Sequence, residues 1–296
     1  MAIKEIEVKS ALHYHDTKFA SNYDLNIYRG CEHRCEYCFA QYSHEYLESD
    51  FFNDIFVKTN IAEILDKELT KKPLNDCQIN ICGVCDCYQP FEEKYQLMPQ
   101  ILKVLIKHKQ PVFILTKSPL ILRDYDLIKE LAEKTNVCIS ATVTTLNEEI
   151  RKKIEPHTFP SIERIKAIGK FATTTKCETN IMLMPIIPYL TDSIYNIEEI
   201  YKTTKSYGIK NIIPGPLHLR GNLKKNFYKF LSLHFPDTYK NIQHLYKNAY
   251  ISKDYSQKLN NFLLKMKKKY NLYSYQMPDL QNNVYIPKQL DLFDKQ

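Results

Sequence analysis

The chain has 296 residues, of which 44% are hydrophobic and 25% charged. This composition is typical of a globular protein with one large domain, or a domain plus an extension. The longest largely apolar run, residues 181–190, is broken by Pro185 and Pro188, so we expect no membrane span. The first ten residues carry acids and lack an apolar core, which argues against a secretory signal and predicts a cytoplasmic protein.

The net charge of +7 is concentrated toward the C-terminus. Residues 221–296 contain 13 Lys and 5 Asp with no Arg or Glu, whereas residues 1–220 hold 28 basic and 29 acidic side chains. Nine of the 22 tyrosines also lie in residues 221–296. Basic charge interleaved with aromatic rings suits single-stranded nucleic acid. The alternative is a solvated, lysine-rich helical face.

Short apolar runs alternate with amphipathic stretches in the first part of the chain. The runs predict strands over residues 24–28, 78–83, 112–116, 137–142, 180–184 and 211–213. The stretches between them predict helices over residues 61–69, 99–108, 127–134, 162–171 and 197–207. This alternation predicts an α/β fold with a parallel sheet, and six units fit a partial (β/α)6 barrel better than a complete eight-fold one.

Beyond residue 220 the pattern is helical only, with helices expected over residues 223–234, 237–248 and 255–270. The last twenty residues, with Pro278 and Pro287, predict an extended tail. We therefore divide the chain into a barrel domain (1–220), a basic helical extension (221–276) and a tail (277–296).

Cys31, Cys35 and Cys38 form a CxxxCxxC triplet directly after the first predicted strand and Gly30. Three thiolates on one short loop can bind three irons of a 4Fe-4S cluster and leave the fourth iron open. This spacing is typical of radical S-adenosylmethionine (SAM) enzymes, in which reductive cleavage of SAM gives a 5'-deoxyadenosyl radical. The alternative is a zinc site completed by His33, but structural zinc takes four ligands in paired spacings.

Four more cysteines, Cys77, Cys82, Cys85 and Cys87, fall within eleven residues. The chain has nine cysteines, an odd number, so in a reducing compartment we expect metal binding or reactive thiols rather than disulfides. Strand alternation allows Cys82 to face the barrel interior, where Cys82 or Cys85 is a candidate hydrogen donor. Two other interpretations stay open: small buried core residues, and ligands of an auxiliary cluster.

Several motifs together resemble the spore photoproduct lyase-related radical SAM proteins, which are also called DNA repair photolyase-like. They are NIYRGC at 26–31, YCFA at 37–40, DCYQP at 86–90, ILTKS at 114–118, RD at 123–124, EP at 155–156 and PIIP at 185–188. The resemblance covers roughly residues 8–220. It implies the same partial barrel, a 4Fe-4S cluster, SAM and an external electron donor.

The resemblance also implies roles for particular residues. Lys117 should meet the SAM carboxylate, Ser140 should contact SAM, and Tyr37 should lie against the adenine. Asp86 heads a family-like run at the end of the second predicted strand, where barrel active sites form, so we expect a polar catalytic group there. The hydrogen-donor cysteine of spore photoproduct lyase itself has no certain counterpart, because Cys82 and Cys85 bracket its place.

The tail contains Gln289, Leu290, Asp291, Leu292 and Phe293. This pentapeptide is similar to the motif by which bacterial repair and replication proteins bind the sliding clamp. An extended segment can place its apolar side chains in a groove while Gln289 bonds at the rim. The alternative is that these side chains dock on the chain's own surface.

Three hypotheses follow for the function. The first is a radical SAM enzyme, lyase-like, that acts on a damaged or modified base of DNA, which a duplex would have to flip out. The second keeps the radical chemistry but makes the substrate a peptide or small molecule. The third is a cluster-bearing DNA-binding accessory protein without turnover.

Overall fold

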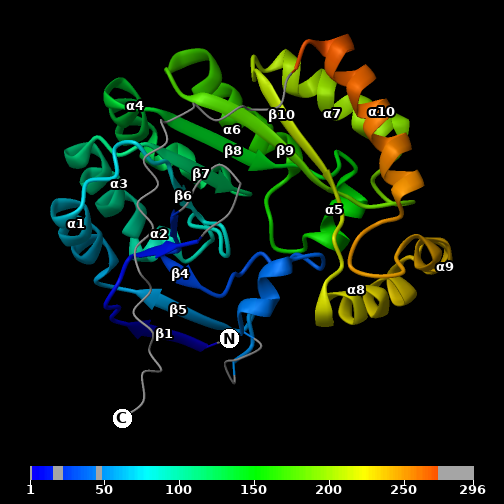
Figure 1. The fold of residues 1–296 in the computed structure, drawn as a ribbon, viewed down its shortest axis with the longest axis horizontal. Helices are drawn as coiled ribbons and strands as arrows, with labels where there is room; N and C mark the ends of the chain where they lie inside the picture. Colours follow the sequence, from blue (N-terminus) through cyan, green and yellow to red (C-terminus); the bar gives the residue numbers. More distant parts are fainter. Residues whose placement is uncertain (1, 16–22, 45–48, 273–296) are drawn as a thin grey trace.

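A seven-stranded sheet forms the centre of the molecule (Figure 1). The computed structural model describes residues 2–15, 23–44 and 49–272. The strands run in the order β10 (Asn211–Pro216), β9 (Glu178–Ile186), β8 (Val137–Thr142), β7 (Val112–Thr116), β6 (Ile79–Ile81), β3 (Tyr23–Leu25) and β2 (Leu12–Tyr14). All neighbours pair in parallel except β2, which is antiparallel to β3 at the edge.

Helices connect the six parallel strands in chain order. They are α1 (Ile61–Lys71), α2 (Glu92–Tyr95) and α3 (Leu97–His108), α4 (Tyr125–Lys134), α5 (Glu148–Ile154) and α6 (Ser161–Thr174), and α7 (Ile194–Ser206). The α/β class and the parallel sheet are therefore confirmed. None of the helices in the described part of the chain is long and apolar enough to cross a membrane.

One face of the sheet carries the main apolar core. Leu25, Ile81, Ile114 and Ile139 lie in one register row across β3, β6, β7 and β8, and all four are fully buried. Helix residues such as Leu65 of α1 cover this face. Because burying one such side chain contributes about 1.5–3 kcal/mol, this face accounts for much of the fold's stability.

The opposite face of the sheet carries polar side chains on β3 and β6 and on β8, β9 and β10, since successive side chains along a strand alternate between faces. The β7 side chains on that face are apolar. Asp24 and Asn80 are register partners on β3 and β6, and the Asn80 amide donates to Asp24 at 2.8 Å. Ser140, Asn180 and Asn211 form a second polar row across β8, β9 and β10. Polar chemistry is therefore available on the face that the helices do not cover.

The first predicted strand, over residues 24–28, is wrong in its extent. β3 ends at Leu25, and Tyr28–Arg29 form β4, which joins a separate sheet of order β1-β5-β4. In that sheet β5 (Asp54–Lys58) pairs in parallel with β1 (Ala2–Ile6). The chain leaves the large sheet at Asn26, whose side chain accepts a hydrogen bond from the Val84 backbone.

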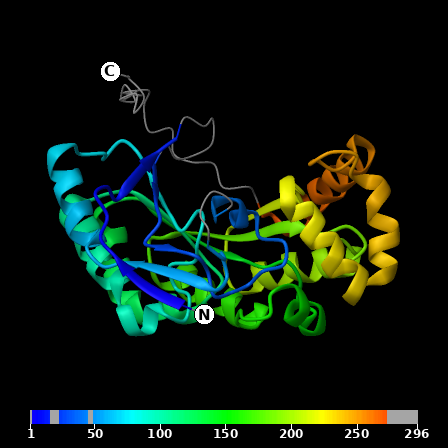
Figure 2. The same cartoon turned by 90° about the horizontal axis from the view of Figure 1, so that it is seen from below.

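The C-terminal helices gather at one end of the molecule, opposite α1 (Figure 2). They are α8 (Gly221–His234), α9 (Pro236–Ile242), the 3-10 turn η3 (Gln243–Leu245) and α10 (Lys253–Tyr270). The single helix predicted over 237–248 is wrong, since α9 ends at Ile242. Ser252 caps α10 by accepting from the Tyr255 backbone, and Asn271 ends it in the left-handed region.

A second apolar core joins these helices to the CxxxCxxC loop. It contains Leu217, Leu223 and Phe227 together with Cys35 and Tyr37. The helical segment after residue 220 therefore packs directly against the cysteine loop.

Candidate functional site

The cysteine triplet lies on a tight loop directly after β4. Gly30 has φ +86°, and an added Cβ would lie 2.5 Å from the Asp54 carbonyl oxygen, so only glycine fits there. The Cys31 backbone donates to the Phe51 carbonyl at 3.1 Å, and the Cys38 backbone donates to the Cys35 carbonyl at 3.0 Å. These bonds fix the path of the loop beside β5.

The three thiols share one electrostatic neighbourhood. Burial raises the pKa of each; the Cys35 pKa rises to about 12, although the Lys117 ammonium opposes this shift. Lys117 also opposes the rise of the Cys38 pKa, and the charges of Cys35 and Cys38 act on Cys31. The three sulfurs therefore lie within electrostatic reach of one another, and Lys117 lies within reach of Cys35 and Cys38.

This donor set fits an iron–sulfur cluster. Cys31, Cys35 and Cys38 are all free thiols on one loop. Among the described residues, no group of three or more His, Cys, Asp or Glu side chains is arranged to hold a single metal ion. A cluster does not need such convergence, because each thiolate binds a different iron.

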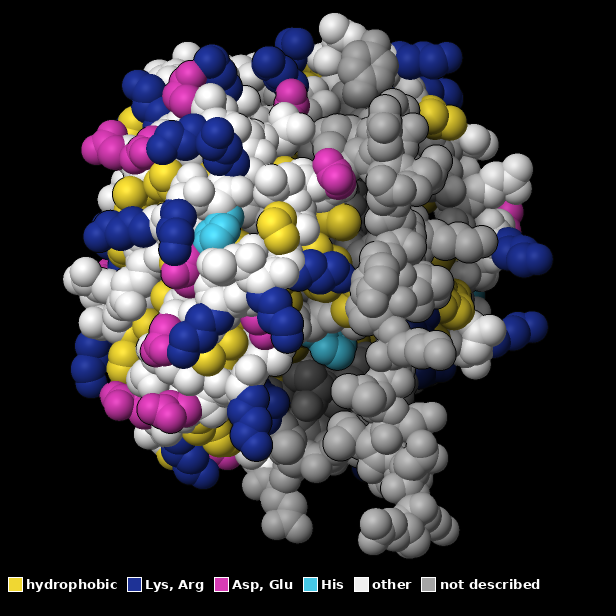
Figure 3. All heavy atoms as spheres, turned by 60° about the vertical axis from the view of Figure 1, so that its left-hand side comes forward, with side chains coloured by type: hydrophobic (Ala, Val, Ile, Leu, Met, Phe, Trp, Pro, Cys, Tyr) yellow, Lys and Arg dark blue, Asp and Glu magenta, His cyan; other side chains and the backbone are white. Residues whose placement is uncertain are grey.

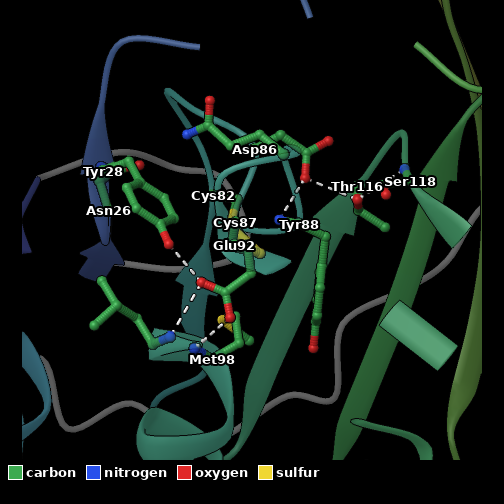
Figure 4. The surroundings of a disulfide bond; sticks show 12 residues. Asn26, Tyr28, Cys82, Asp86, Cys87, Tyr88, Glu92, Met98, Thr116 and Ser118 are labelled. Atoms are coloured by element: carbon green, nitrogen blue, oxygen red, sulfur yellow. Dashed lines mark hydrogen bonds between the residues drawn. A yellow bond between two sulfur atoms is a disulfide. The ribbon is translucent and has the colours of Figure 1, made fainter. Parts of the chain in front are cut away.

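Asp86 links the cysteine loop to the end of β7, and Figure 4 shows its carboxylate beside Thr116. Its carboxylate lies 3.0 Å from the His33 Nε2 atom within the triplet, and it accepts from Thr116 Oγ1 at 2.8 Å. It also accepts from the backbone N–H groups of Tyr88 at 2.9 Å and Lys117 at 2.6 Å. Burial opposes ionisation, but His33 and these hydrogen bonds outweigh it and lower the Asp86 pKa to about 2. The predicted catalytic aspartate is thus a buried, fully bonded anion.

Lys117 follows β7 and lies near a group of acidic side chains. Burial lowers its pKa, but Cys35, Glu155, Cys38 and Asp86 together outweigh burial and raise it. The ammonium lies 5.9 Å from the centre of the Tyr37 ring. Lys117 therefore stays a cation beside the cysteine loop.

Tyr37 forms a hydrogen bond with a buried ion pair that was not predicted from the sequence. Its hydroxyl donates to Glu155, and Arg164 lies 2.7 Å from the second oxygen of that carboxylate. The side chains of Glu155 and Arg164 are fully buried. Arg164 also donates to the carbonyls of Thr142, at the end of β8, and Phe159. This pair links the cysteine loop to the β8 end of the sheet.

Ser140 lies fully buried on β8, on the polar face of the sheet. Its hydroxyl is 3.4 Å from the Asn180 carbonyl. The Asn180 side-chain amide donates to Cys138 Sγ at 2.9 Å, while its Oδ1 has no hydrogen-bond partner in the described chain. Asn180 is a buried acceptor next to Ser140 that sequence reasoning missed.

The second cysteine group contains a disulfide between Cys82 and Cys87, with Cα atoms 5.6 Å apart (Figure 4). The expectation that disulfides are absent is therefore wrong. Cys82 has φ +74°, which turns the chain sharply after β6 and brings the two residues together. Cys85 stays a buried free thiol whose pKa burial raises to about 11, and Cys77 is free and half-buried. In the disulfide state Cys82 has no S–H hydrogen, so a donor role requires the reduced pair.

A cleft of about 700 Å³ lies beside the cysteine loop. Its lining residues come from the loop, from the segment before β5 and from the first turns of α8: Arg34, Glu36, Gln41, Ser49, Asp50, Phe51, Phe52, Asp54, Asn222, Leu223 and Asn226. The cleft borders the cysteine loop at Arg34 and Glu36, and none of the three cysteines lines it.

The predicted site residues therefore lie in three places. Around the cysteine loop the structure brings together Cys31, Cys35, Cys38, Tyr37, Lys117 and Asp86. Ser140 lies within the sheet, and the Cys82–Cys87 disulfide lies in the loop after β6. The tail motif at 289–293 lies outside the described residues.

The sequence has relatives among proteins of unassigned function. Uncharacterized protein Rv2578c of Mycobacterium tuberculosis is 31% identical over 255 residues, which cover 84% of this chain and 75% of that protein. Uncharacterized protein MJ0683 of Methanocaldococcus jannaschii is 28% identical over 241 residues, covering 80% and 86%. No protein-family model matches the sequence.

Solved structures identify the fold. Spore photoproduct lyase complexed with dinucleoside spore photoproduct has a TM-score of 0.69 at 12% identity, covering 93% of this chain and 82% of that one. A mutant of the same lyase with bound AdoMet and dinucleoside spore photoproduct has a TM-score of 0.68. Streptococcus suis SuiB bound to S-adenosylmethionine has a TM-score of 0.52 at 14% identity, covering 87% and 47%. The chain therefore has the fold of these radical SAM proteins, and it belongs to the family of Rv2578c.

Proposed function

We propose that this protein is a radical SAM enzyme that acts on DNA. The observation that carries the proposal is the group of three free cysteines on one loop, with the Lys117 cation beside Cys35 and Cys38. Held by Cys31, Cys35 and Cys38, a 4Fe-4S cluster would supply the chemistry of reductive SAM cleavage, which yields a 5'-deoxyadenosyl radical. An external one-electron donor completes the system.

The protein's own residues would bind and orient SAM. Lys117 would offer a cation to the SAM carboxylate, and the Tyr37 ring would lie against the adenine. Ser140 would contact SAM from the polar face of the sheet, which we regard as the interior of a partial (β/α)6 barrel. Asp86 keeps Lys117 and the cysteine loop in place, since it binds the Lys117 backbone and His33.

Hydrogen return to the substrate is the proposed role of the second cysteine group. After a dithiol reductant has opened the disulfide by giving it two electrons and two protons, Cys82 can give its S–H hydrogen atom to a substrate radical. The S–H bond then breaks, a C–H bond forms, and the unpaired electron passes to the Cys82 sulfur as a thiyl radical, which the external one-electron donor and a proton return to the thiol. Cys85 is the other candidate, as a free buried thiol in the same loop. If neither cysteine donates a hydrogen, both are small buried residues of the apolar core.

DNA is the substrate class that the charge distribution favours. The basic extension, residues 221–276, carries lysines and tyrosines next to the cysteine loop. The lyase of the same fold binds a dinucleoside photoproduct. A damaged or modified base flipped out of a duplex is therefore the expected target, with lyase-like chemistry in the cytoplasm. Tail residues Gln289, Leu290, Leu292 and Phe293 would bring the enzyme to a sliding clamp.

A peptide substrate is the second candidate. It is favoured by the structure of SuiB bound to its precursor peptide SuiA, which has a TM-score of 0.54 and covers 87% of this chain. The two candidates place the abstracted hydrogen on different polymers, so isotope transfer separates them.

The test is an anaerobic reaction of reconstituted protein with SAM and dithionite. Deuterated oligonucleotides, with and without photodamage, and deuterated peptides are supplied in separate reactions. Deuterium in 5'-deoxyadenosine from an oligonucleotide supports DNA as substrate. Deuterium from the peptides alone transfers the proposal to the second candidate. Absence of 5'-deoxyadenosine from every reaction would leave only the accessory, non-catalytic interpretation.

A further inference from the structure

We propose that Tyr250, Arg220 and His218 form a stacking platform for single-stranded DNA, set beside the cysteine loop. This inference rests on the proposed function and gives it a location. We call these three residues the platform.

The platform is built from two segments held together by the backbone. Residues 217–220 are extended after β10, so Leu217 and Leu219 are buried while His218 and Arg220 are exposed. The Leu219 backbone donates to the Ala249 carbonyl at 2.9 Å, which sets Tyr250 beside the exposed pair.

The three side chains are ordered by contacts with one another. The Arg220 guanidinium lies 5.2 Å from the centre of the Tyr250 ring and donates to its hydroxyl. The His218 ring lies 5.1 Å from the Tyr250 ring at an interplanar angle of 71°. Tyr250 nevertheless remains 49% exposed. A preordered, half-exposed aromatic ring next to a guanidinium suits a nucleobase and its phosphate.

The segment of chain that carries the platform is strongly basic. Between residues 200 and 253 the chain holds ten Lys or Arg and a single carboxylate, Asp237. Four exposed lysines in this stretch form no ion pair with any carboxylate of the described chain: Lys225, Lys229, Lys247 and Lys253. Cations without a carboxylate partner can neutralise the phosphates of a nucleic acid.

Several lysines on the sheet-covering helices pair with a carboxylate on their own helix, as in Lys67–Glu63, Lys134–Glu130 and Lys166–Glu163. Figure 3 shows the face over these helices on the α1 side, where acidic and basic side chains are interspersed. On the C-terminal helices Lys240 and Lys258 pair in the same way, with Asp237 and Asp254. The four unpaired lysines named above are therefore the candidates for contact with a phosphate backbone.

The platform is connected to the candidate site. Leu217 and Leu219 belong to the apolar core that contains Cys35 and Tyr37. Arg220 directly precedes α8, whose first turns line one wall of the 700 Å³ cleft, while the cysteine loop lines the other. A strand stacked on Tyr250 is thus placed next to that cleft. A single strand, or a flipped nucleotide, exposes the base face that stacking needs.

The test measures binding of a labelled single-stranded oligonucleotide of about 12 nucleotides by fluorescence anisotropy. Tyr250→Ala should weaken binding by about 5- to 100-fold, whereas Tyr250→Phe keeps the ring and should stay within about twofold of wild type. Arg220→Ala should weaken binding as well, and Arg220→Lys should restore only part of it. Lys225→Ala should lower the slope of log affinity against log salt by about 0.7.

Tyr195→Ala is the matched control, because Tyr195 on α7 is 77% exposed and lies outside the platform. It should bind the oligonucleotide like wild type. If the wild type binds the oligonucleotide and both Tyr250→Ala and Arg220→Ala bind it with the same affinity, the platform is overturned. The proposed enzyme function is not affected by that result. A wild type that releases 5'-deoxyadenosine but does not bind the oligonucleotide would overturn both the platform and the DNA substrate. Circular dichroism verifies that each variant is folded.

Discussion

Replacing Glu155 tests whether the buried ion pair supports the cysteine loop. Glu155→Gln keeps the size of the side chain but removes its charge, so the fully buried Arg164 guanidinium loses the carboxylate 2.7 Å away. Breaking one partner of a buried pair costs about 3–5 kcal/mol. In a chain of 296 residues that corresponds to a fall of about 5–8 °C in the melting temperature.

The assay is thermal unfolding of the cluster-free protein, followed by circular dichroism. Glu163→Gln is the matched control, since the Glu163–Lys166 pair on α6 is about half exposed and should contribute less than about 1 kcal/mol. The double variant Glu155→Gln/Arg164→Met removes both charges and should be more stable than Glu155→Gln alone. Because the Tyr37 hydroxyl donates to Glu155, the single variant should also retain less iron after reconstitution.

Two results would refute this reasoning. One is a melting temperature of Glu155→Gln equal to that of Glu163→Gln. The other is a double variant that loses the sum of the two single losses, because additive losses mean that the two side chains do not interact.

Three further predictions concern other parts of the molecule. Asp86→Asn should lower the free energy of unfolding by about 2.5 kcal/mol near neutral pH. Because the folded-state pKa of Asp86 lies below its usual 3.8, the wild type should lose this advantage as pH falls from about 4 through 2. A difference in unfolding free energy between the two proteins that stays the same at every pH would contradict the prediction. Non-reduced peptide mapping should show a Cys82–Cys87 bond that is absent in Cys87→Ser, and if the reduced pair returns hydrogen, Cys82→Ser should change the product distribution; identical products would make the pair structural. Deleting residues 288–296 should abolish binding to a sliding clamp in surface plasmon resonance, and unchanged binding would remove the motif from the proposal.

The strands of the large sheet could be predicted because their side chains are buried on one or both faces of the sheet, which gives short apolar runs in the sequence. The runs 112–116 and 137–142 match β7 and β8 at both ends. β1 was missed, since AIKEI is almost fully exposed and becomes a strand only by pairing with β5. The break between β3 and β4 depends on Asn26 binding Val84, a contact between residues far apart in sequence.

The candidate site was predictable where the sequence spacing carries the chemistry. The triplet is visible in the sequence because three cysteines on one loop need no tertiary information. Glu155 and Arg164 were recognised only as motif or helix residues, since their pairing requires α5 and α6 to fold beside the loop. Cys87 was not recognised as a disulfide partner, because composition says nothing about the left-handed turn at Cys82.

The most direct test of the radical SAM proposal compares three anaerobically reconstituted proteins. Wild type should bind about four irons per chain and release 5'-deoxyadenosine from SAM under reduction. Cys35→Ala should lose both properties, whereas Cys177→Ala, which removes a buried cysteine outside the loop, should keep both. A Cys35→Ala protein that keeps its cluster and its 5'-deoxyadenosine release would contradict the central claim.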